Sequence, residues 1–173
     1  MASGKKPIRI FANFFERGFS DNKFLAKLKQ FVHNNRLITR YFDIELTEQV
    51  LLKAGEQSKQ LLALLHENGI SLVLDKFGMG YSSIRHLKDS PIDRIKIDKL
   101  FIDRAALDGH EAPYVNAIIA MSQSLNIKTV AVGIEEKQQR QFIEQTQCDI
   151  VQGFIYHKPM DAQSLKELLQ PAD

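Results

Sequence analysis

Residues 61–75 read LLALLHENGISLVLD, and this stretch contains the repeating unit of the fold. Leu61, Leu62, Leu64 and Leu65 recur at the spacing of one helix face. Gly69 follows at the position where helices commonly end. The apolar run at 71–75 (SLVLD) then has the composition of a strand buried on both faces of a parallel sheet. The stretch therefore predicts a helix that leads directly into a strand.

The same unit recurs on both sides of this stretch. Helical spacing marks 24–32 after Asp21, 115–125, a segment around Phe142 and Ile143, and a last helix capped by Asp161. Further strands are predicted at 8–12 (IRIFA), 41–45 (YFDIE), 94–97 (RIKI), 128–132 (KTVAV) and 149–153 (DIVQG). Repeated strand–helix units predict an α/β fold with about six parallel strands and right-handed crossovers.

Composition excludes several classes of protein. The 173 residues carry 23 basic and 21 acidic side chains, and a net charge of +2 is too small to indicate a nucleic-acid partner. Cys148 is the single cysteine, so neither an intramolecular disulfide nor a cysteine-based zinc site is available. No apolar run reaches the roughly 18 residues of a membrane span. We expect one cytoplasmic domain at 8–173, after a flexible lead-in or tag at 1–7.

Polar residues follow the predicted strands at the edge of the sheet where α/β proteins carry their chemistry. Carboxylate and amide oxygens gathered there suggest a site for a hard cation such as Mg²⁺ or Mn²⁺. The alternative is that these residues only cap helices. The residues concerned are Asn13, Glu45, Asp75, Lys96, Glu135 and Gln152.

Five short motifs occur in a fixed order along the chain. They are ELTE (45–48), LDKFGMGYSSI (74–84), IKID (95–98), AVGIEE (131–136) and QGF (152–154). Together they resemble the EAL domain, the bacterial cyclic di-GMP phosphodiesterase family with a modified (β/α)₈ barrel. The resemblance implies metal-assisted hydrolysis of one phosphodiester bond to linear pGpG, with divalent ions held by carboxylates.

The resemblance also assigns roles to individual residues. Asn13, Glu45 and Asp75 correspond to metal ligands of the family. Lys96 corresponds to the lysine that hydrogen-bonds the attacking water or the phosphate, and Glu135 to the second Glu of the family's EGVE motif. Gln152 corresponds to a glutamine near the metal. The loop that couples dimer contacts to metal binding corresponds to Gly78, Gly80, Tyr81 and Ser82.

Several departures from the family pattern predict a degenerate site. Lys76 stands where the second Asp of the DDFG motif would bind metal, and Val132 where the first Glu of EGVE would act as base. Met79 and Phe15 replace a usual Thr and Ser. The segment with the first barrel strand, its metal-binding Glu and a phosphate-binding Arg is missing before Ile8. We therefore expect an incomplete (β/α)₈ barrel that lacks most of the family's catalytic power.

Two lysines have alternative interpretations. Lys76 is either a solvated surface residue or an ammonium that occupies the vacated metal position and pairs with Glu45 or Asp75. Lys96 is either catalytic or a pairing partner in a relic site.

The phenylalanines of the first strand region also allow two interpretations. They are either core for the missing strand or an exposed association surface, and we favour a dimer or partner contact beside the unpaired edge of 8–12. The residues are Phe11, Phe14, Phe15 and Phe19.

Three functions remain open on this reasoning. The first is a degenerate EAL-type domain that acts as a regulatory or protein-interaction module, as a homodimer or with a protein partner. The second is a fragment of a metal-dependent phosphodiesterase. The third is a receptor that binds cyclic di-GMP without cleaving it. For all three we expect a cytoplasmic location, alone or within a larger signalling protein, and no nucleic-acid or membrane contact.

Overall fold

A six-stranded parallel sheet forms the centre of the computed structural model, which describes residues 8–16, 18, 21–52, 55–79 and 87–169. Each strand pairs with its neighbour in the sequence, so the strand order follows the chain order from β1 to β6. All six predicted strands are confirmed, with small shifts at their ends. Their bounds are β1 Ile10–Asn13, β2 Phe42–Thr47, β3 Ser71–Phe77, β4 Arg94–Ile97, β5 Lys128–Val132 and β6 Ile150–Gln152.

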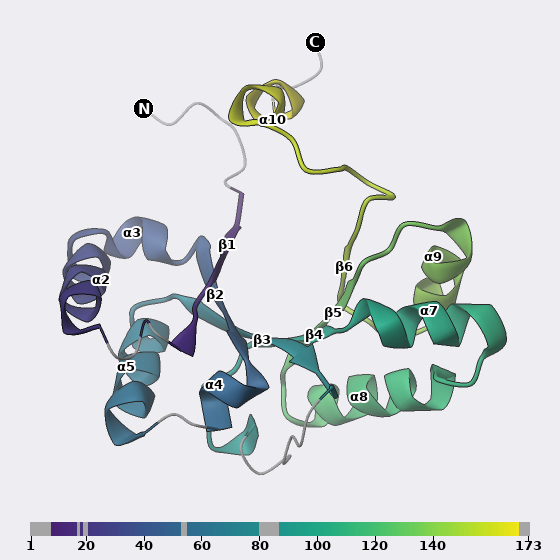
Figure 1. Cartoon of the computed structure of the whole chain (residues 1–173), viewed down its shortest axis with the longest axis horizontal. Helices are drawn as coiled ribbons and strands as arrows, with labels where there is room; N and C mark the ends of the chain where they lie inside the picture. Colours follow the sequence, from purple (N-terminus) through teal and green to yellow (C-terminus); the bar gives the residue numbers. More distant parts are fainter. Residues whose placement is uncertain (1–7, 17, 19–20, 53–54, 80–86, 170–173) are drawn as a thin grey trace.

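Helices cover the outer face of the sheet in two groups (Figure 1). One group, beside β1 to β3, contains α2 Asn22–Asn34, α3 Arg36–Thr39, α4 Glu48–Leu52 and α5 Glu56–Glu67. The other group, beside β4 to β6, contains α7 Lys99–Asp108, α8 Ala112–Ser124 and α9 Lys137–Glu144. α10, Ala162–Leu168, lies apart from both groups. In the described part of the chain, no helix is both long and apolar enough to span a membrane.

The predicted helix boundaries agree with the capping geometry. Asp21 caps α2 by accepting hydrogen bonds from the backbone N–H groups of Lys23 and Phe24, and Asp161 caps α10 through the N–H of Ser164. After α5, Gly69 takes a left-handed conformation with φ +85°. The sequence interpretation missed α3, α4 and α7.

The two faces of the sheet differ in chemistry because successive side chains along a strand point to opposite sides. The outer face is apolar, with Leu46, Leu72 and Ile95 buried in the main core. The inner face carries charged side chains at the alternate positions, among them Asp43 and Glu45 of β2 and Lys96 of β4, and these are buried too. The expected burial on both faces is therefore confirmed for the central strands, but the inner face mixes charged side chains with valines such as Val73 and Val130.

The phenylalanines near β1 do not behave as one group. Phe14 is buried, and its ring centroid lies 5.6 Å from that of Phe24 on α2. Phe11 and Phe15 are exposed, Phe15 to 72%. Phe19 falls outside the described residues, as does the predicted lead-in at 1–7. β1 is an edge strand that pairs only with β2 in the described part of the chain. The dimer contact proposed for this edge stays a prediction.

Candidate functional site

A cavity of about 830 Å³ opens at the carboxyl ends of β1, β2 and β3. Asn13, Glu45 and Asp75, the three predicted metal ligands, all line this cavity. Asn13 and Glu45 are direct register partners on neighbouring strands, and Asp75 lies beside Thr47, two residues beyond Glu45. Parallel pairing thus brings the three side chains to one edge of the sheet, as the strand-end pattern predicts.

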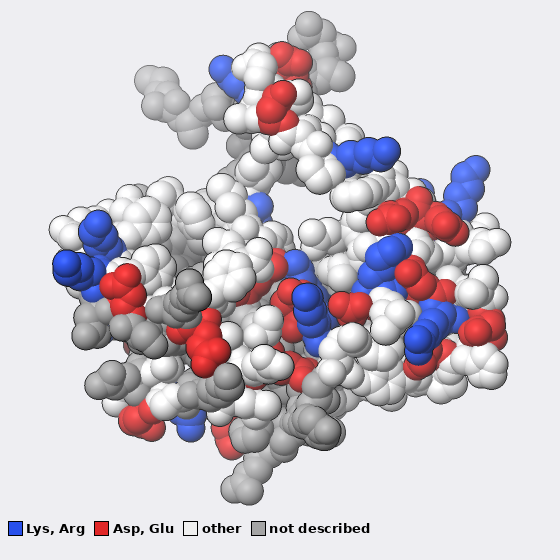
Figure 2. Space-filling view, in the orientation of Figure 1, with Lys and Arg blue, Asp and Glu red and all other residues white. Residues whose placement is uncertain are grey.

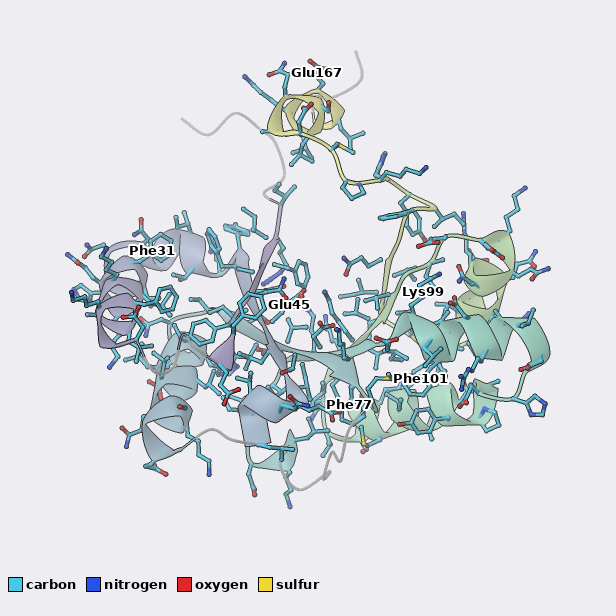
Figure 3. The ribbon with its side chains drawn as sticks, viewed as in Figure 1. Phe31, Glu45, Phe77, Lys99, Phe101 and Glu167 are labelled. Atoms are coloured by element: carbon cyan, nitrogen blue, oxygen red, sulfur yellow. The ribbon has the colours of Figure 1, made fainter. Side chains whose placement is uncertain are left out.

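The carboxylate of Glu45 is held by Lys96. The Lys96 ammonium forms an ion pair with Oε1 of Glu45, and the two side chains are only 8% and 7% exposed. The Lys96 ammonium also lies 5.3 Å from the ring centroid of Phe11. Figure 3 places Glu45 near the centre of the molecule, between the two groups of helices. This ion pair supports the interpretation of Lys96 as a pairing partner of Glu45.

Lys76 does not form the ion pair suggested for it. Within the described residues, Glu45 pairs with Lys96, and Lys76 is exposed and takes part in no ion pair. The reason lies in the backbone, because the β3–β4 register shifts between Leu74 and Phe77. Lys76 lies in this irregularity with φ +55°, a left-handed conformation. The alternative interpretation, a solvated lysine, fits the exposed side chain.

Glu135 belongs to a different cluster. The ammonium of Lys99 donates to the Gly133 carbonyl at 3.1 Å and to Asp103 at 3.2 Å, and lies 3.5 Å from Oε2 of Glu135. Burial lowers the pKa of Lys99, but hydrogen bonds to Asp103 and Glu135 and their negative charges outweigh that effect and raise it. Figure 3 shows Lys99 on the α7 side of the molecule, apart from Glu45.

A glutamine on α9 fixes the backbone around Glu135. Oε1 of Gln139 accepts hydrogen bonds from the N–H groups of Glu135 at 2.7 Å and Glu136 at 2.8 Å, and its amide donates to Asp103. Gln139 is buried. Sequence reasoning missed both Lys99 and Gln139, although Gln139 follows Glu136 at the spacing of a capping box, a pattern visible in the sequence.

Val132 and Gln152 are register partners on β5 and β6. Val132 is half-buried, and Gln152 is exposed. Neither residue, nor Glu135, lines the 830 Å³ cavity. The position at which the family resemblance places a base therefore holds a hydrocarbon side chain beside an amide. Val132 provides no atom that can accept a proton.

Gly78 is tied to Glu48 and Tyr114. The Gly78 N–H donates to Oε1 of Glu48 at 2.9 Å, and the Tyr114 hydroxyl donates to the Gly78 carbonyl at 3.4 Å. Burial raises the pKa of Tyr114, and the charges of Glu48 and Glu111 raise it further. Glu48 belongs to the ELTE motif, whereas no sequence signal points to Tyr114. Gly80, Tyr81 and Ser82 lie outside the described residues.

The donor set does not fit a divalent cation well. Among the described residues, no three His, Cys, Asp or Glu side chains are grouped so that they could hold a metal ion. Asn13 and Asp75 contribute oxygen atoms near Glu45, but the charge of Glu45 is compensated by Lys96. Figure 2 shows acidic and basic side chains next to each other over the centre of the molecule, without a wholly acidic patch. A hard cation needs several unpaired oxygen ligands.

Comparison with known proteins places these observations in a family. The EAL domain family profile matches residues 1–159. The cyclic di-GMP phosphodiesterase NbdA of Pseudomonas aeruginosa is 32% identical over 168 residues, which are 97% of this chain and 22% of NbdA. The bifunctional diguanylate cyclase/cyclic di-GMP phosphodiesterase MucR of the same species is 35% identical over 152 residues, 88% of this chain and 22% of MucR. The chain thus spans about a fifth of these relatives.

Solved structures agree with the fold. The PaMucR phosphodiesterase in complex with c-di-GMP superposes with a TM-score of 0.81 at 32% identity, covering 91% of this chain and 64% of that one. The EAL domain of Mycobacterium smegmatis DcpA gives a TM-score of 0.83 at 27% identity, covering 94% and 72%. With six parallel strands, flanking helices and this sequence match, the chain belongs to the EAL domain family.

Proposed function

We propose that this chain is a catalytically inactive EAL domain that acts as a regulatory or protein-interaction module in cyclic di-GMP signalling. The observation that supports this most directly is the hydrocarbon side chain of Val132 at the carboxyl end of β5, where the family pattern places the base. In addition, Lys96 forms an ion pair with Glu45. The carboxylate expected to bind metal is buried and already compensated by an ammonium group. A divalent ion would have to displace that ammonium, and the displaced charge would lose its partner in a buried site.

A second departure points the same way. Lys76 places an ammonium group where the family pattern has a metal-binding carboxylate, so this position offers no oxygen ligand. Val132 cannot take a proton from an attacking water. Loss of one group that stabilises the transition state typically costs roughly 3 kcal/mol, or two to three orders of magnitude in rate. Such losses do not add fully, but even a fraction of their sum leaves little turnover.

The test is metal-dependent hydrolysis of cyclic di-GMP. The purified chain is incubated with cyclic di-GMP and Mg²⁺ or Mn²⁺, and pGpG is quantified by chromatography, with NbdA as a positive control. We expect no product above the protein-free blank. Turnover of roughly 1 s⁻¹ or more, ordinary for enzymes, would overturn the proposal.

A double variant locates the defect. Lys76→Asp combined with Val132→Glu restores the two residues of the family pattern, and Lys59→Asp on the exposed surface of α5 is the matched control. If Lys76 and Val132 account for the inactivity, the double variant gains metal-dependent turnover and the control does not. If the double variant stays inactive, these two residues do not account for the inactivity by themselves.

A second candidate function is binding of cyclic di-GMP without cleavage. It is favoured by the size of the 830 Å³ cavity, which falls within the range of small-molecule sites, and by the exposed ring of Phe15 on its wall. Isothermal titration calorimetry with cyclic di-GMP, in the absence of metal, tests it. Saturable binding that weakens in Phe15→Ala supports a receptor. If no binding heat is detected at high ligand concentration, the chain is not a cyclic di-GMP receptor, and a protein partner is the remaining candidate ligand.

A further inference from the structure

A second cavity, of about 350 Å³, lies at the opposite end of the strands from the site above. Its walls come from the amino ends of β3, β4 and β5 and from Arg9, just before β1. Basic side chains dominate the lining, namely Arg9, Arg94, Lys128 and His66, with Asp93 as the acidic residue. Nothing in the proposed function uses this cavity.

Two guanidinium groups beside the cavity share a single carboxylate. Asp43 is fully buried, and its two oxygens accept hydrogen bonds from Arg9 at 2.9 Å and from Arg94 at 2.7 Å. Arg94 also donates to the hydroxyl of Ser71 at 3.0 Å. One carboxylate compensates one positive charge, so this pair of arginines keeps a surplus of one.

A third cation stands directly beside Arg94. Arg94 and Lys128 are register partners on β4 and β5, so their side chains leave the sheet on the same face as close neighbours. Like charges placed opposite each other on paired strands repel. Lys128 is exposed and forms no ion pair within the described part of the chain. An anion between the two residues would turn this repulsion into attraction.

Arg94 also has an unused donor. Its side chain is only 11% exposed, and its Nε–H is buried without a hydrogen-bond partner among the described residues. A buried donor left unsatisfied destabilises the folded chain, and more so when the group is charged. Together, the surplus charge, the Arg94–Lys128 neighbours and the unpaired N–H give this cavity the charge and the donors that suit an anion.

We propose that this cavity binds a phosphate-sized oxyanion, either free phosphate or the phosphate group of a phosphomonoester. Arginine and lysine side chains that converge on one point are suited to phosphate oxygens, and guanidinium groups bind them through paired N–H donors. Asp93 lowers the positive charge of the lining, and its carboxylate accepts a hydrogen bond from the Leu72 N–H at 2.8 Å and contacts His66 at 3.2 Å. Three cations, Arg9, Arg94 and Lys128, still face only two carboxylates, Asp43 and Asp93, which leaves a net charge of +1.

A purely structural role is the competing explanation, since charged layers at this end of a parallel barrel often serve stability. The two explanations separate in a binding experiment. The intact chain is titrated with potassium phosphate, and separately with GMP, in a chloride buffer of constant ionic strength, by calorimetry and by ¹H–¹⁵N NMR of the arginine Nε–H signals. We expect saturable binding and a shift of the Arg94 Nε–H signal.

Variants test whether this cavity is responsible. Lys128→Gln removes a cation with no ion-pair partner among the described residues, so the fold is retained; we expect about tenfold weaker binding or more. Arg9→Gln is the second variant, because Arg94 still pairs with Asp43. Lys59→Gln, near the other end of α5 from His66, is the matched control and keeps the affinity of the unmodified chain.

The outcomes decide the proposal. Binding of phosphate alone identifies the free ion, and equal binding of GMP identifies a phosphomonoester group; both support the site. Absence of saturable binding at about 10 mM, far above a micromolar Kd, overturns it. Binding that is unchanged in both Lys128→Gln and Arg9→Gln overturns it as well, because the anion would then bind elsewhere. Neither result depends on whether the chain hydrolyses cyclic di-GMP.

Discussion

Lys96 on β4 and Glu45 on β2 reach each other across an intervening strand and form a buried ion pair. Val73 of β3 is fully buried and is the register partner of Glu45 on one side and of Arg94, two residues before Lys96, on the other. The contact between Glu45 and Lys96 therefore runs diagonally across β3 on the inner face. The pair is consequently part of the packing of the sheet as well as of the candidate site.

Removing the ammonium should therefore destabilise the fold. We expect Lys96→Met to lower the free energy of unfolding by about 3 kcal/mol or more, because the Glu45 carboxylate would remain buried without a partner. Urea denaturation measures this. The double variant Lys96→Met/Glu45→Gln should recover part of the loss, and Lys59→Met on the exposed face of α5 should change little. A loss for Lys96→Met no larger than for Lys59→Met would contradict the buried pair.

The left-handed backbone at residue 76 predicts an order of stability among substitutions. Asn adopts this conformation more readily than Lys, and β-branched residues adopt it least. With φ +55° at this position, we expect Lys76→Asn to raise the free energy of unfolding by about 0.5 kcal/mol and Lys76→Val to lower it by about 1 kcal/mol or more. Chemical denaturation checks the order. Equal stability of the two variants would argue against a left-handed residue 76.

Two glycines form a matched pair for testing the Lys99 cluster. Gly133 and Gly109 have nearly the same backbone angle, φ +74° and +75°. A Cβ atom at Gly133 would lie 2.6–2.7 Å from the side chain of Lys99, whereas nothing lies within 4 Å at Gly109. We expect Gly109→Ala to cost about 1 kcal/mol for the backbone alone and Gly133→Ala about 1–3 kcal/mol more. Thermal unfolding of both variants gives the difference, and equal costs would contradict the close approach of Lys99.

The phenol of Tyr114 predicts a dependence of stability on alkaline pH. Burial and the charges of Glu48 and Glu111 raise its pKa above 10.0, so the folded state holds this proton more tightly than the unfolded state. The contribution of Tyr114 to stability is thus complete below pH 10 and is lost as the pH rises through the higher, folded-state pKa. Tyr114→Phe should flatten the fall in stability above pH 10.

Absorbance titration of tyrosinate gives an independent measurement on the same group. The Tyr114 phenol should ionise late, and this late phase should disappear in Tyr114→Phe. Glu48→Gln should move it to lower pH by removing one of the charges that raise the pKa. A late phase that survives Tyr114→Phe would assign it to another residue.

The strands could be predicted because each is a short apolar run between turn and cap residues, and Asp21, Gly69 and Asp161 mark helix ends locally. The helices that were not predicted lack such clear local signals. α7 buries only Ile102 and Ala105, so its apolar spacing is weak. Its N-cap, Asp98, is the last residue of the IKID motif, so the capping signal coincides with a motif of the candidate site.

The candidate site was predictable in its composition but less in its contacts. Asn13, Glu45 and Asp75 meet because parallel strands align their ends, a general property of the fold. The choice of Lys96 over Lys76 as the partner of Glu45 depends on the register shift between β3 and β4, which is set by pairing between residues far apart in the chain. Tyr114 contacts Gly78 from α8, and no local sequence pattern predicts this contact.

The sequential strand order has a consequence for how this chain folds. Every strand joins the edge formed by the strand before it, so no strand has to wait for a later segment to be inserted between existing neighbours. Each strand pairs across one strand–helix unit, so the chain avoids the longer loop closures of a shuffled strand order, although parallel pairing is itself slow. The sheet can therefore grow in the direction of synthesis, with each new strand and helix added to a template already in place as the chain leaves the ribosome.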